Sequence, residues 1–231
     1  MSADQKVIVV IPAFNEEKSI SKVIEAIPKG VVSDLIVTNN NSTDNTSKVA
    51  SEAGAIVLDE KRKGYGWACL KGIEKAKELG ATIIVFLDGD YSDHPEQLPE
   101  VIAPILENQA DLVIGSRALG KKEKGSLTPQ QVFGNWLATR LMRIFYGVKY
   151  TDLGPFRAIT VEGLDKLNMQ DKTYGWTIEM QIRAAQHKLR SVEVTVDYRK
   201  RIGASKVSGT VKGTIMAGYK IIFAILKYKF V

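Results

Sequence analysis

The stretch Ile83-Ile84-Val85-Phe86-Leu87-Asp88-Gly89-Asp90 decides the fold, because five apolar residues lead directly into two carboxylates separated by one glycine. A continuous apolar run of this length is typical of a strand buried on both faces, as in the middle of a parallel sheet. Side chains that follow such a strand lie at the carboxyl edge of the sheet, where open α/β folds bind ligands. Two carboxylates this close suit a hard divalent cation such as Mg²⁺ or Mn²⁺, and the alternative is that they only cap the next turn.

The rest of the chain repeats a pattern of an apolar strand followed by a helix. Apolar strands that alternate with helices of 10–15 residues are typical of βαβ units and a mostly parallel sheet. The sequence therefore predicts an α/β fold with a Rossmann-like central sheet and helices on both faces. We expect strands at residues 7–11, 35–37, 55–58, 83–87, 112–115 and 192–196. We expect helices at residues 15–27, with Asn15 as N-cap, and at residues 129–146, 177–186 and 210–229, with two more ending near residues 53 and 79.

Polar residues follow four of these strands. Right-handed crossovers bring the carboxyl ends of parallel strands to one edge of the sheet. We therefore expect residues 12–16, 39–40, 88–90 and 115–117 to converge there.

The size and composition indicate one globular domain. The 231 residues show no internal repeat and no low-complexity linker, so we expect a single domain over residues 1–231, with residues 1–118 as its nucleotide-binding half and residues 119–231 as its second half. The single cysteine, Cys69, excludes an internal disulfide and lies in an apolar helical segment, where we expect a packed thiol. The first residues contain no signal region and no apolar run reaches about 18 residues, so we expect a cytoplasmic protein.

The net charge of +6 is unevenly distributed. From Arg183 to the end the chain has eleven Lys or Arg residues and two acidic residues, a local charge of +9. This asymmetry points to an anionic partner, which could be a nucleic acid, a phosphorylated substrate or a membrane surface.

The expected final helix contributes to this charge. It has apolar residues on one face, with lysines beside them: Ile215, Tyr219, Ile222, Leu226 and Phe230, then Lys212, Lys220 and Lys227. It suits either peripheral attachment to the cytoplasmic face of an anionic membrane or packing on the core with its lysines outward.

Six short motifs are spread along nearly the whole chain, from Ile11 to Lys206. In order they are Ile11-Pro12-Ala13-Phe14-Asn15-Glu16-Glu17, Asn41-Ser42-Thr43-Asp44-Asn45-Thr46, Leu87-Asp88-Gly89-Asp90, Gly115-Ser116-Arg117, Asp152-Leu153-Gly154-Pro155-Phe156-Arg157 and Arg201-Ile202-Gly203-Ala204-Ser205-Lys206. Together they resemble the family 2 glycosyltransferases of the GT-A fold, and most closely the branch that contains the dolichyl-phosphate mannose and glucose synthases.

This resemblance implies an inverting transfer of a hexose from a nucleotide diphosphate sugar, assisted by Mg²⁺ or Mn²⁺. A metal that acts as a Lewis acid stabilises the leaving diphosphate. Asp88, Gly89 and Asp90 resemble the family's metal and donor motif, and Ser92 holds the position of a third metal ligand. Arg201 and Lys206 are the candidates for electrostatic stabilisation of the diphosphate, with a solvated basic loop as the alternative.

The donor's base and ribose correspond to the loops after the first two strands. Pro12, Phe14 and Glu16 resemble the first-strand loop, where Phe14 can stack on a base and Glu16 can accept ribose hydrogen bonds, although a carboxylate in a first helical turn also favours the helix dipole. Asn39 and Asn40 stand where the family usually has an acidic residue that accepts a base N–H. We prefer a UDP-glucose-like donor, with guanine as the alternative base.

The branch resemblance makes a polyprenyl or dolichyl phosphate the expected acceptor. Such a phosphate is already anionic and needs no strong general base. Arg117, Arg140 and Arg157 are candidates to hold it through bidentate contacts, with Arg140 alternatively a surface residue. Arg117 is also a candidate to contact the donor.

A hydroxyl acceptor, soluble or in the cell envelope, is the alternative within the same fold. In that case Glu179 or Asp152 becomes the candidate base. Trp176 could stack on the sugar, although an aromatic residue at a helix start is more often part of the core. We assign no role to His94 or His187.

Two other classes of protein compete with a glycosyltransferase. A nucleotidyltransferase generally needs a glycine-rich loop with Lys or Arg after the first strand, and Pro12-Ala13-Phe14-Asn15 is not one. A nucleic-acid or anionic-membrane binding module without catalysis would explain the basic C-terminal part. No nucleic-acid recognition motif accompanies it, so we expect no nucleic-acid partner.

Overall fold

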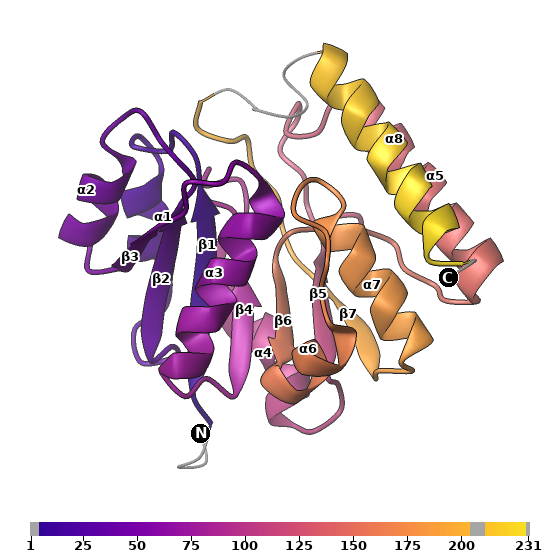
Figure 1. Cartoon of the computed structure of the whole chain (residues 1–231), viewed down its shortest axis with the longest axis horizontal. Coiled ribbons are helices and arrows are strands. Elements are labelled where there is room, and N and C mark those ends of the chain that lie inside the picture. Colours follow the sequence, from indigo (N-terminus) through magenta and orange to yellow (C-terminus); the bar gives the residue numbers. More distant parts are fainter. Residues whose placement is uncertain (1–4, 204–210, 230–231) are drawn as a thin grey trace.

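The structure is a computed structural model that describes residues 5–203 and 211–229 (Figure 1). Its centre is a seven-stranded sheet with the order β3-β2-β1-β4-β6-β5-β7. All neighbouring strands are parallel except β6, which is antiparallel to both β4 and β5. The strands are β1 Val7–Ala13, β2 Asp34–Asn39, β3 Ile56–Asp59, β4 Ile83–Phe86, β5 Leu112–Ser116, β6 Arg157–Thr160 and β7 Ser191–Thr195. The expected α/β fold with a mostly parallel sheet is confirmed.

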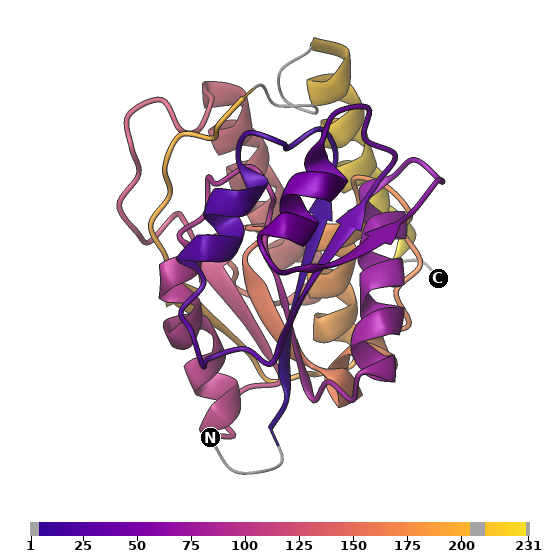
Figure 2. The same cartoon turned by 90° about the vertical axis from the view of Figure 1, so that its left-hand side faces the viewer.

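Helices cover both faces of the sheet, as Figure 2 shows. Alternate residues of β1 point to opposite faces, so that Val7 and Val9 pack with α1, α2 and α4, whereas Ile8 and Val10 pack with α3, α6 and α7. The helices are α1 Ile20–Ala26, α2 Thr46–Glu52, α3 Tyr65–Glu78, α4 Leu98–Leu106, α5 Pro129–Tyr146, α6 Val161–Leu167, α7 Trp176–Gln186 and α8 Val211–Lys227, with a 3₁₀ turn η1 at Pro95–Gln97.

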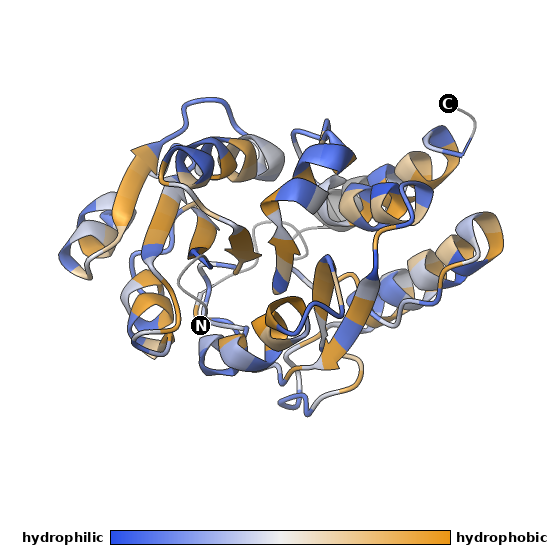
Figure 3. Cartoon of the chain, turned by 90° about the horizontal axis from the view of Figure 1, so that it is seen from below, coloured by the Kyte–Doolittle hydropathy of each residue, from blue (hydrophilic) through white to orange (hydrophobic). Residues whose placement is uncertain are grey.

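A third apolar cluster joins α5, α7 and α8. Ala138 and Met142 of α5 meet Ile178 and Ile182 of α7, and Ile225 of α8 completes the contact. In Figures 1 and 3, α5 and α8 lie side by side at the end of the molecule farthest from β3 and α2. Within the described residues, no helix is both long and apolar enough to cross a membrane.

The helix expected at residues 15–27 is shorter, because Asn15 adopts a left-handed conformation with φ of 55° and α1 begins only at Ile20. The Asn15 side chain instead accepts a hydrogen bond from the backbone N–H of Thr43 at 2.8 Å, which ties the β1–α1 loop to the loop after β2. Cys69 is fully buried, as expected of a packed thiol, and its burial raises the pKa of the thiol.

Candidate active site

Loops that follow β1, β2 and β4 meet at the carboxyl edge of the sheet. The backbone N–H of Asn40 donates to the carbonyl of Ala13 at 2.8 Å, so the first two loops lie in contact. A Cβ on Gly89 would lie 3.5 Å from Cγ of Glu16, which places the loop after β4 beside the loop after β1. Three of the four polar clusters singled out in the sequence are therefore brought together directly.

Three carboxylates gather at the end of β4, two of them buried and one half-buried. Asp90 and Asp93 are 4% and 2% exposed, and Asp88 lies beside them with its backbone N–H 3.5 Å from Oδ2 of Asp93. Burial, together with the charge of Asp90, raises the pKa of Asp88 to about 6. Burial, together with the charge of Asp88, raises the pKa of Asp93 to about 8. The raised pKa values show that the positive groups nearby do not fully compensate the negative charge of these carboxylates.

Asp93 is a site residue that the sequence analysis missed. Its Oδ1 is buried and has no hydrogen-bond partner among the described residues. The signal was available, because a third aspartate follows Asp90 by three residues in the same loop. Tyr65, whose hydroxyl donates to Asp88 at 3.1 Å, gave no such signal, since it comes from the first turn of α3.

The segment after β7 supplies positive charge to these carboxylates. Nη1 of Arg201 lies 2.9 Å from Oδ2 of Asp90, and the backbone N–H of Ile202 donates to the Asp90 carbonyl at 2.9 Å. Ser92 is fully buried and donates to the other carboxylate oxygen of Asp90 through its hydroxyl, at 2.5 Å, and its backbone N–H. The structure thus places Ser92 and Arg201 at the predicted metal motif, whereas Lys206 lies outside the described residues.

Arg117 and Asp152 bind each other, so neither side chain is free to bind a ligand without breaking this pair. Nε and Nη2 of Arg117 donate to the two oxygens of Asp152, both at 2.7 Å, and the Arg117 backbone N–H donates to Oδ2 at 2.8 Å. Burial opposes ionisation of Asp152, but the charge and hydrogen bonds of Arg117 hold the pKa of Asp152 below its usual value. Asp152 is therefore a poor candidate for a general base, because its lowered pKa makes it a weak proton acceptor and its oxygens are already engaged.

Arg157, a predicted acceptor ligand, points into the protein. Its side chain is fully buried and donates to the carbonyls of Leu153, Gly154 and Thr177. Burial lowers the pKa of Arg157 to about 10. An acceptor phosphate cannot reach this guanidinium, so the expected role of Arg157 is replaced by a structural one.

Glu179 and Trp176 also serve the interior. Glu179 is fully buried and accepts hydrogen bonds from four groups: the backbone N–H groups of Gln170 and Asp171, Nε of Arg183 and the hydroxyl of Tyr228. Trp176 is 1% exposed and meets Phe86 edge to face at 6.3 Å between ring centroids. The candidate base is thus a structural carboxylate, and the candidate sugar platform is part of the core. Arg140 is exposed on α5, as the surface alternative had it.

The two asparagines after β2 organise their loop. The Asn40 amide nitrogen donates to the carbonyls of Glu60 and Arg62, and its oxygen accepts from the backbone N–H of Gly64. The Asn39 amide donates to Asp59 at 2.8 Å and accepts from the backbone N–H of Ser42 at 3.0 Å. These hydrogen bonds make loop structure the first role of both residues. The Asn39 oxygen still has a second lone pair that could accept a hydrogen bond from a ligand.

A hollow lies between the β1–α1 loop and the segment after Arg201. It has a volume of about 220 Å³ and is lined by Glu16, Asp44, Ile202 and Gly203 among others. Glu16 is nearly buried and accepts from the Ser19 hydroxyl at 3.0 Å. Phe14, next to it, is 37% exposed and presents an aromatic ring at the same edge, next to Pro12, which is buried in β1.

The carboxylates fit a divalent cation that arrives with phosphates. Among the described residues no three His, Cys, Asp or Glu side chains form a ready metal cage. Mg²⁺ is commonly held by one or two carboxylates, with phosphate oxygens and waters completing the shell. Asp88 and Asp90 provide that donor set. The Oδ1 of Asp93 has no hydrogen-bond partner among the described residues, and a cation nearby would favour the ionised form of this carboxyl group.

Comparison with known proteins gives a consistent result. The sequence model described as "Glycosyl transferase family 2" matches residues 8–167. An uncharacterised glycosyltransferase of Mycobacterium tuberculosis is 37% identical over 93% of this chain and 95% of its own length. An undecaprenyl-phosphate mannosyltransferase of Micrococcus luteus is 30% identical over 90% of each chain. A UDP-N-acetylglucosamine–dolichyl-phosphate N-acetylglucosaminyltransferase of Methanococcus voltae is 30% identical over 98% of this chain and 97% of its own length.

A solved structure shares the arrangement of elements. The crystal structure of glucosyl-3-phosphoglycerate synthase from Mycobacterium tuberculosis in complex with Mg²⁺ and uridine diphosphate superposes with a TM-score of 0.77. It is 25% identical in sequence and covers 99% of this chain and 81% of its own chain. The likeness extends over the whole sheet and its helices.

Proposed function

Since the chain belongs to glycosyl transferase family 2 and is a glycosyltransferase of the GT-A fold, we propose that it transfers a hexose from a nucleoside diphosphate sugar to a polyprenyl phosphate. The observation that carries this proposal is the cluster of the half-buried Asp88 with the buried Asp90 and Asp93, which has Arg201 against it at the carboxyl edge of the sheet. Sheet edges of this kind bind nucleotides in open α/β folds.

The proposed cofactor is Mg²⁺ or Mn²⁺, held by Asp88 and Asp90, with Ser92 beside them. A solved relative binds Mg²⁺ together with uridine diphosphate, which supports a cation in this fold. A divalent cation at this position supplies Lewis-acid stabilisation to the diphosphate oxygens as the bond to the sugar breaks. The chain fixes the carboxylates in advance, because Tyr65 holds Asp88 and Ser92 holds Asp90.

Arg201 is the proposed electrostatic partner of the leaving diphosphate. Its guanidinium already lies at the carboxylates, so it needs little reorganisation to face a developing negative charge. The backbone hydrogen bond from Ile202 to the Asp90 carbonyl holds the segment over the site. Lys206 follows Arg201 in the same motif and remains a proposed second cation, outside the described residues.

The proposed base and ribose contacts come from the loop after β1. Phe14 is exposed enough to stack on a base, and Glu16 lines the hollow together with Ile202, the residue that follows Arg201. We prefer uridine as the nucleoside, which a relative with a UDP-sugar name and a neighbour bound to uridine diphosphate support. Guanosine is the alternative, because the remaining lone pair of the Asn39 oxygen could accept a hydrogen bond from an N–H group of either base.

The acceptor is proposed to be a lipid phosphate because both candidate bases are engaged. Asp152 is bound to Arg117, and Glu179 accepts four hydrogen bonds in the interior. An acceptor hydroxyl would need one of them to remove a proton, whereas a phosphate oxygen is already ionised and attacks without that help. Two relatives with names that include undecaprenyl or dolichyl phosphate agree with this choice. Arg140, exposed on α5, remains a proposed contact for the acceptor phosphate.

Transfer to an extractable lipid tests the proposal. The purified protein would be mixed with Mg²⁺ or Mn²⁺, undecaprenyl or dolichyl phosphate, and radiolabelled UDP-glucose, UDP-N-acetylglucosamine or GDP-mannose. We expect label from one donor to move into organic solvent only when the lipid phosphate is present. Label that appears solely in a new water-soluble product would replace the lipid by a hydroxyl acceptor. Absence of nucleotide release from every donor would refute the proposed reaction.

A further inference from the structure

Large apolar side chains are exposed together on the outer sides of α5 and α8. We call this surface the outer helix face, and its members are between 38% and 66% exposed. They are Val132, Phe133, Trp136 and Ile144 of α5, and Tyr219, Ile222, Phe223 and Leu226 of α8. The outer helix face is separate from the carboxylates at the end of β4.

Helix geometry shows that each helix has two apolar faces. In α8, Ile221, Ala224, Ile225 and Tyr228 pack inward, whereas the four exposed residues fall within about 100° of arc on the opposite side. One face of the final helix therefore packs on the core, which was one of the two arrangements expected for it, and the other face stays exposed. Buried Ala138 and Met142 of α5 likewise lie opposite its exposed aromatic residues.

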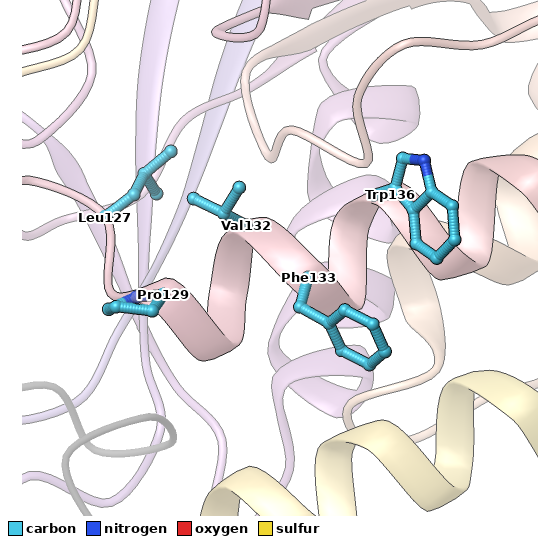
Figure 4. Close-up of a pocket in the computed structure, with 5 residues that line it drawn as sticks. All are labelled: Leu127, Pro129, Val132, Phe133 and Trp136. Carbon is cyan, nitrogen blue, oxygen red and sulfur yellow. The ribbon is translucent and has the colours of Figure 1, made fainter.

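The first turns of α5 carry an apolar hollow on this surface. Its volume is about 520 Å³, and Figure 4 shows its lining residues, Leu127, Pro129, Val132, Phe133 and Trp136, along the start of the helix. The Phe133 and Trp136 rings lie 5.8 Å apart between centroids. An exposed concave apolar surface of this kind marks an interaction site more often than an ordinary surface.

The two chain segments that contain the outer helix face carry charge of one sign. Residues 127–150 and 211–231 contain no Asp or Glu. Arg140 and Arg143 fall within about 60° of Trp136 on the same stripe of α5, and both are exposed. Lys227 and Lys229 are exposed at the end of the chain beside α8.

We propose that the outer helix face binds the surface of an anionic lipid bilayer, with its aromatic and aliphatic side chains in the headgroup region. Apolar residues flanked only by Lys and Arg are the pattern that interfacial helices use on anionic lipids. Trp and Tyr, here Trp136 and Tyr219, favour the membrane–water boundary because they combine an apolar ring with a polar group. A second copy of the chain fits less well, since a symmetric dimer would bring the basic side chains of both copies together.

The inference goes beyond the proposed reaction, because bilayer binding requires neither a sugar donor nor a lipid phosphate acceptor. Binding of the full chain to vesicles is therefore measured without donor or acceptor. One set of vesicles contains phosphatidylcholine alone, and the other contains equal amounts of phosphatidylcholine and phosphatidylglycerol. We expect co-sedimentation with the anionic vesicles that weakens as salt is raised. Failure of this assay would leave sugar transfer intact, and failure of sugar transfer would leave this assay intact.

Charge reversal on α5 gives the sharpest variant. Arg140→Glu/Arg143→Glu should weaken partition onto the anionic vesicles by at least about tenfold, since each basic residue near the surface contributes about 1 kcal/mol. Lys22→Glu/Lys29→Glu is the matched control, because it makes the same change of net charge on exposed residues at and just after α1. The control should bind like the wild type. Equal binding by both charge-reversed variants would overturn the proposal.

Tryptophan emission provides a second readout that does not depend on charge. Trp136 is exposed and Trp176 is buried, so in a Trp67→Phe background the change on vesicle binding comes from Trp136. We expect a blue shift with anionic vesicles, and no shift when Trp136→Phe is added. An unshifted spectrum would contradict the proposal. So would a stable dimer in sedimentation velocity that Trp136→Ser/Phe223→Ser dissociates, because it would assign the face to a second copy.

Discussion

Glu179 is a buried charge held by four donors, and the free energy of folding depends on all of them. Replacing it by glutamine turns one acceptor oxygen into an N–H group that faces other donors. We expect Glu179→Gln to lower the free energy of unfolding by about 3 kcal/mol, measured by urea denaturation.

The matched control is Glu162→Gln, which alters an exposed ion pair with Lys166. Water screens such an exposed pair, so the free energy of unfolding of this variant should hardly change. If Glu179→Gln kept full stability but lost turnover and its pH dependence, the residue would be a general base and our interpretation would be wrong.

For single residues, the sequence motifs predicted which residues lie near the site better than they predicted whether a side chain faces the site or the protein interior. Asp88, Asp90 and Ser92 share one loop, and the structure brings Arg201 to them. Burial of Arg157 and Glu179 was not predictable, because an arginine or glutamate has the same letter whether it meets a ligand or interior partners. Trp176 lies in the core, which was the more frequent role expected of an aromatic residue at a helix start. Only the packing of α7 against β4 and α8 decides which way such side chains face.

The first turn of α3 lies directly on another loop, which makes Gly66 essential for packing. A Cβ at Gly66 would overlap the backbone carbonyl of Asp171, and the backbone N–H of Trp67 donates to the Lys172 carbonyl at 3.3 Å. We expect Gly66→Ala to lower the free energy of unfolding by about 3 kcal/mol, because backbone must move. The measurement is chemical denaturation.

Gly134 in α5 offers the control for this substitution. A Cβ there meets nothing within 4 Å, so Gly134→Ala should raise stability by about 0.5–1 kcal/mol through a lower backbone entropy of the unfolded chain. Equal effects of the two substitutions would show that α3 does not pack on residues 171–172 as described.

Among the elements, the buried strands were the most predictable because their apolar runs are continuous. The start of α1 was predicted too early in the chain. Asparagine is a common N-cap residue, but the Asn15 side chain binds the neighbouring loop instead. The insertion of β6 between β4 and β5 was not predictable, because four residues of mixed polarity carry no information about their partners. Of the apolar face expected on α8, Tyr219, Ile222 and Leu226 are exposed, because the opposite face packs on the core. The side chains of Ile215 and Phe230 lie outside the described part of the chain.

The whole molecule is held together across its two halves. Strand β6 from the second half pairs with β4 from the first, and Trp176 of α7 packs on Phe86 of β4. We therefore propose that residues 1–231 form one cooperative unit. Thermal unfolding followed by circular dichroism and by tryptophan fluorescence should give a single coincident transition. Two separated transitions would show that residues 1–118 and 119–231 fold independently.

Binding of a nucleoside diphosphate with a divalent cation tests the central claim, that Asp88 and its neighbours hold the donor. Calorimetric titration with UDP and with GDP in the presence of Mg²⁺ compares the wild type with Asp88→Asn. Asp34→Asn is the control, because Asp34 lies at the amino end of β2, the opposite edge of the sheet. We predict that one nucleotide binds the wild type and Asp34→Asn alike and binds Asp88→Asn at least about tenfold more weakly, since a cation shared with the diphosphate loses a carboxylate. Equal affinity of Asp88→Asn and the wild type would contradict the account.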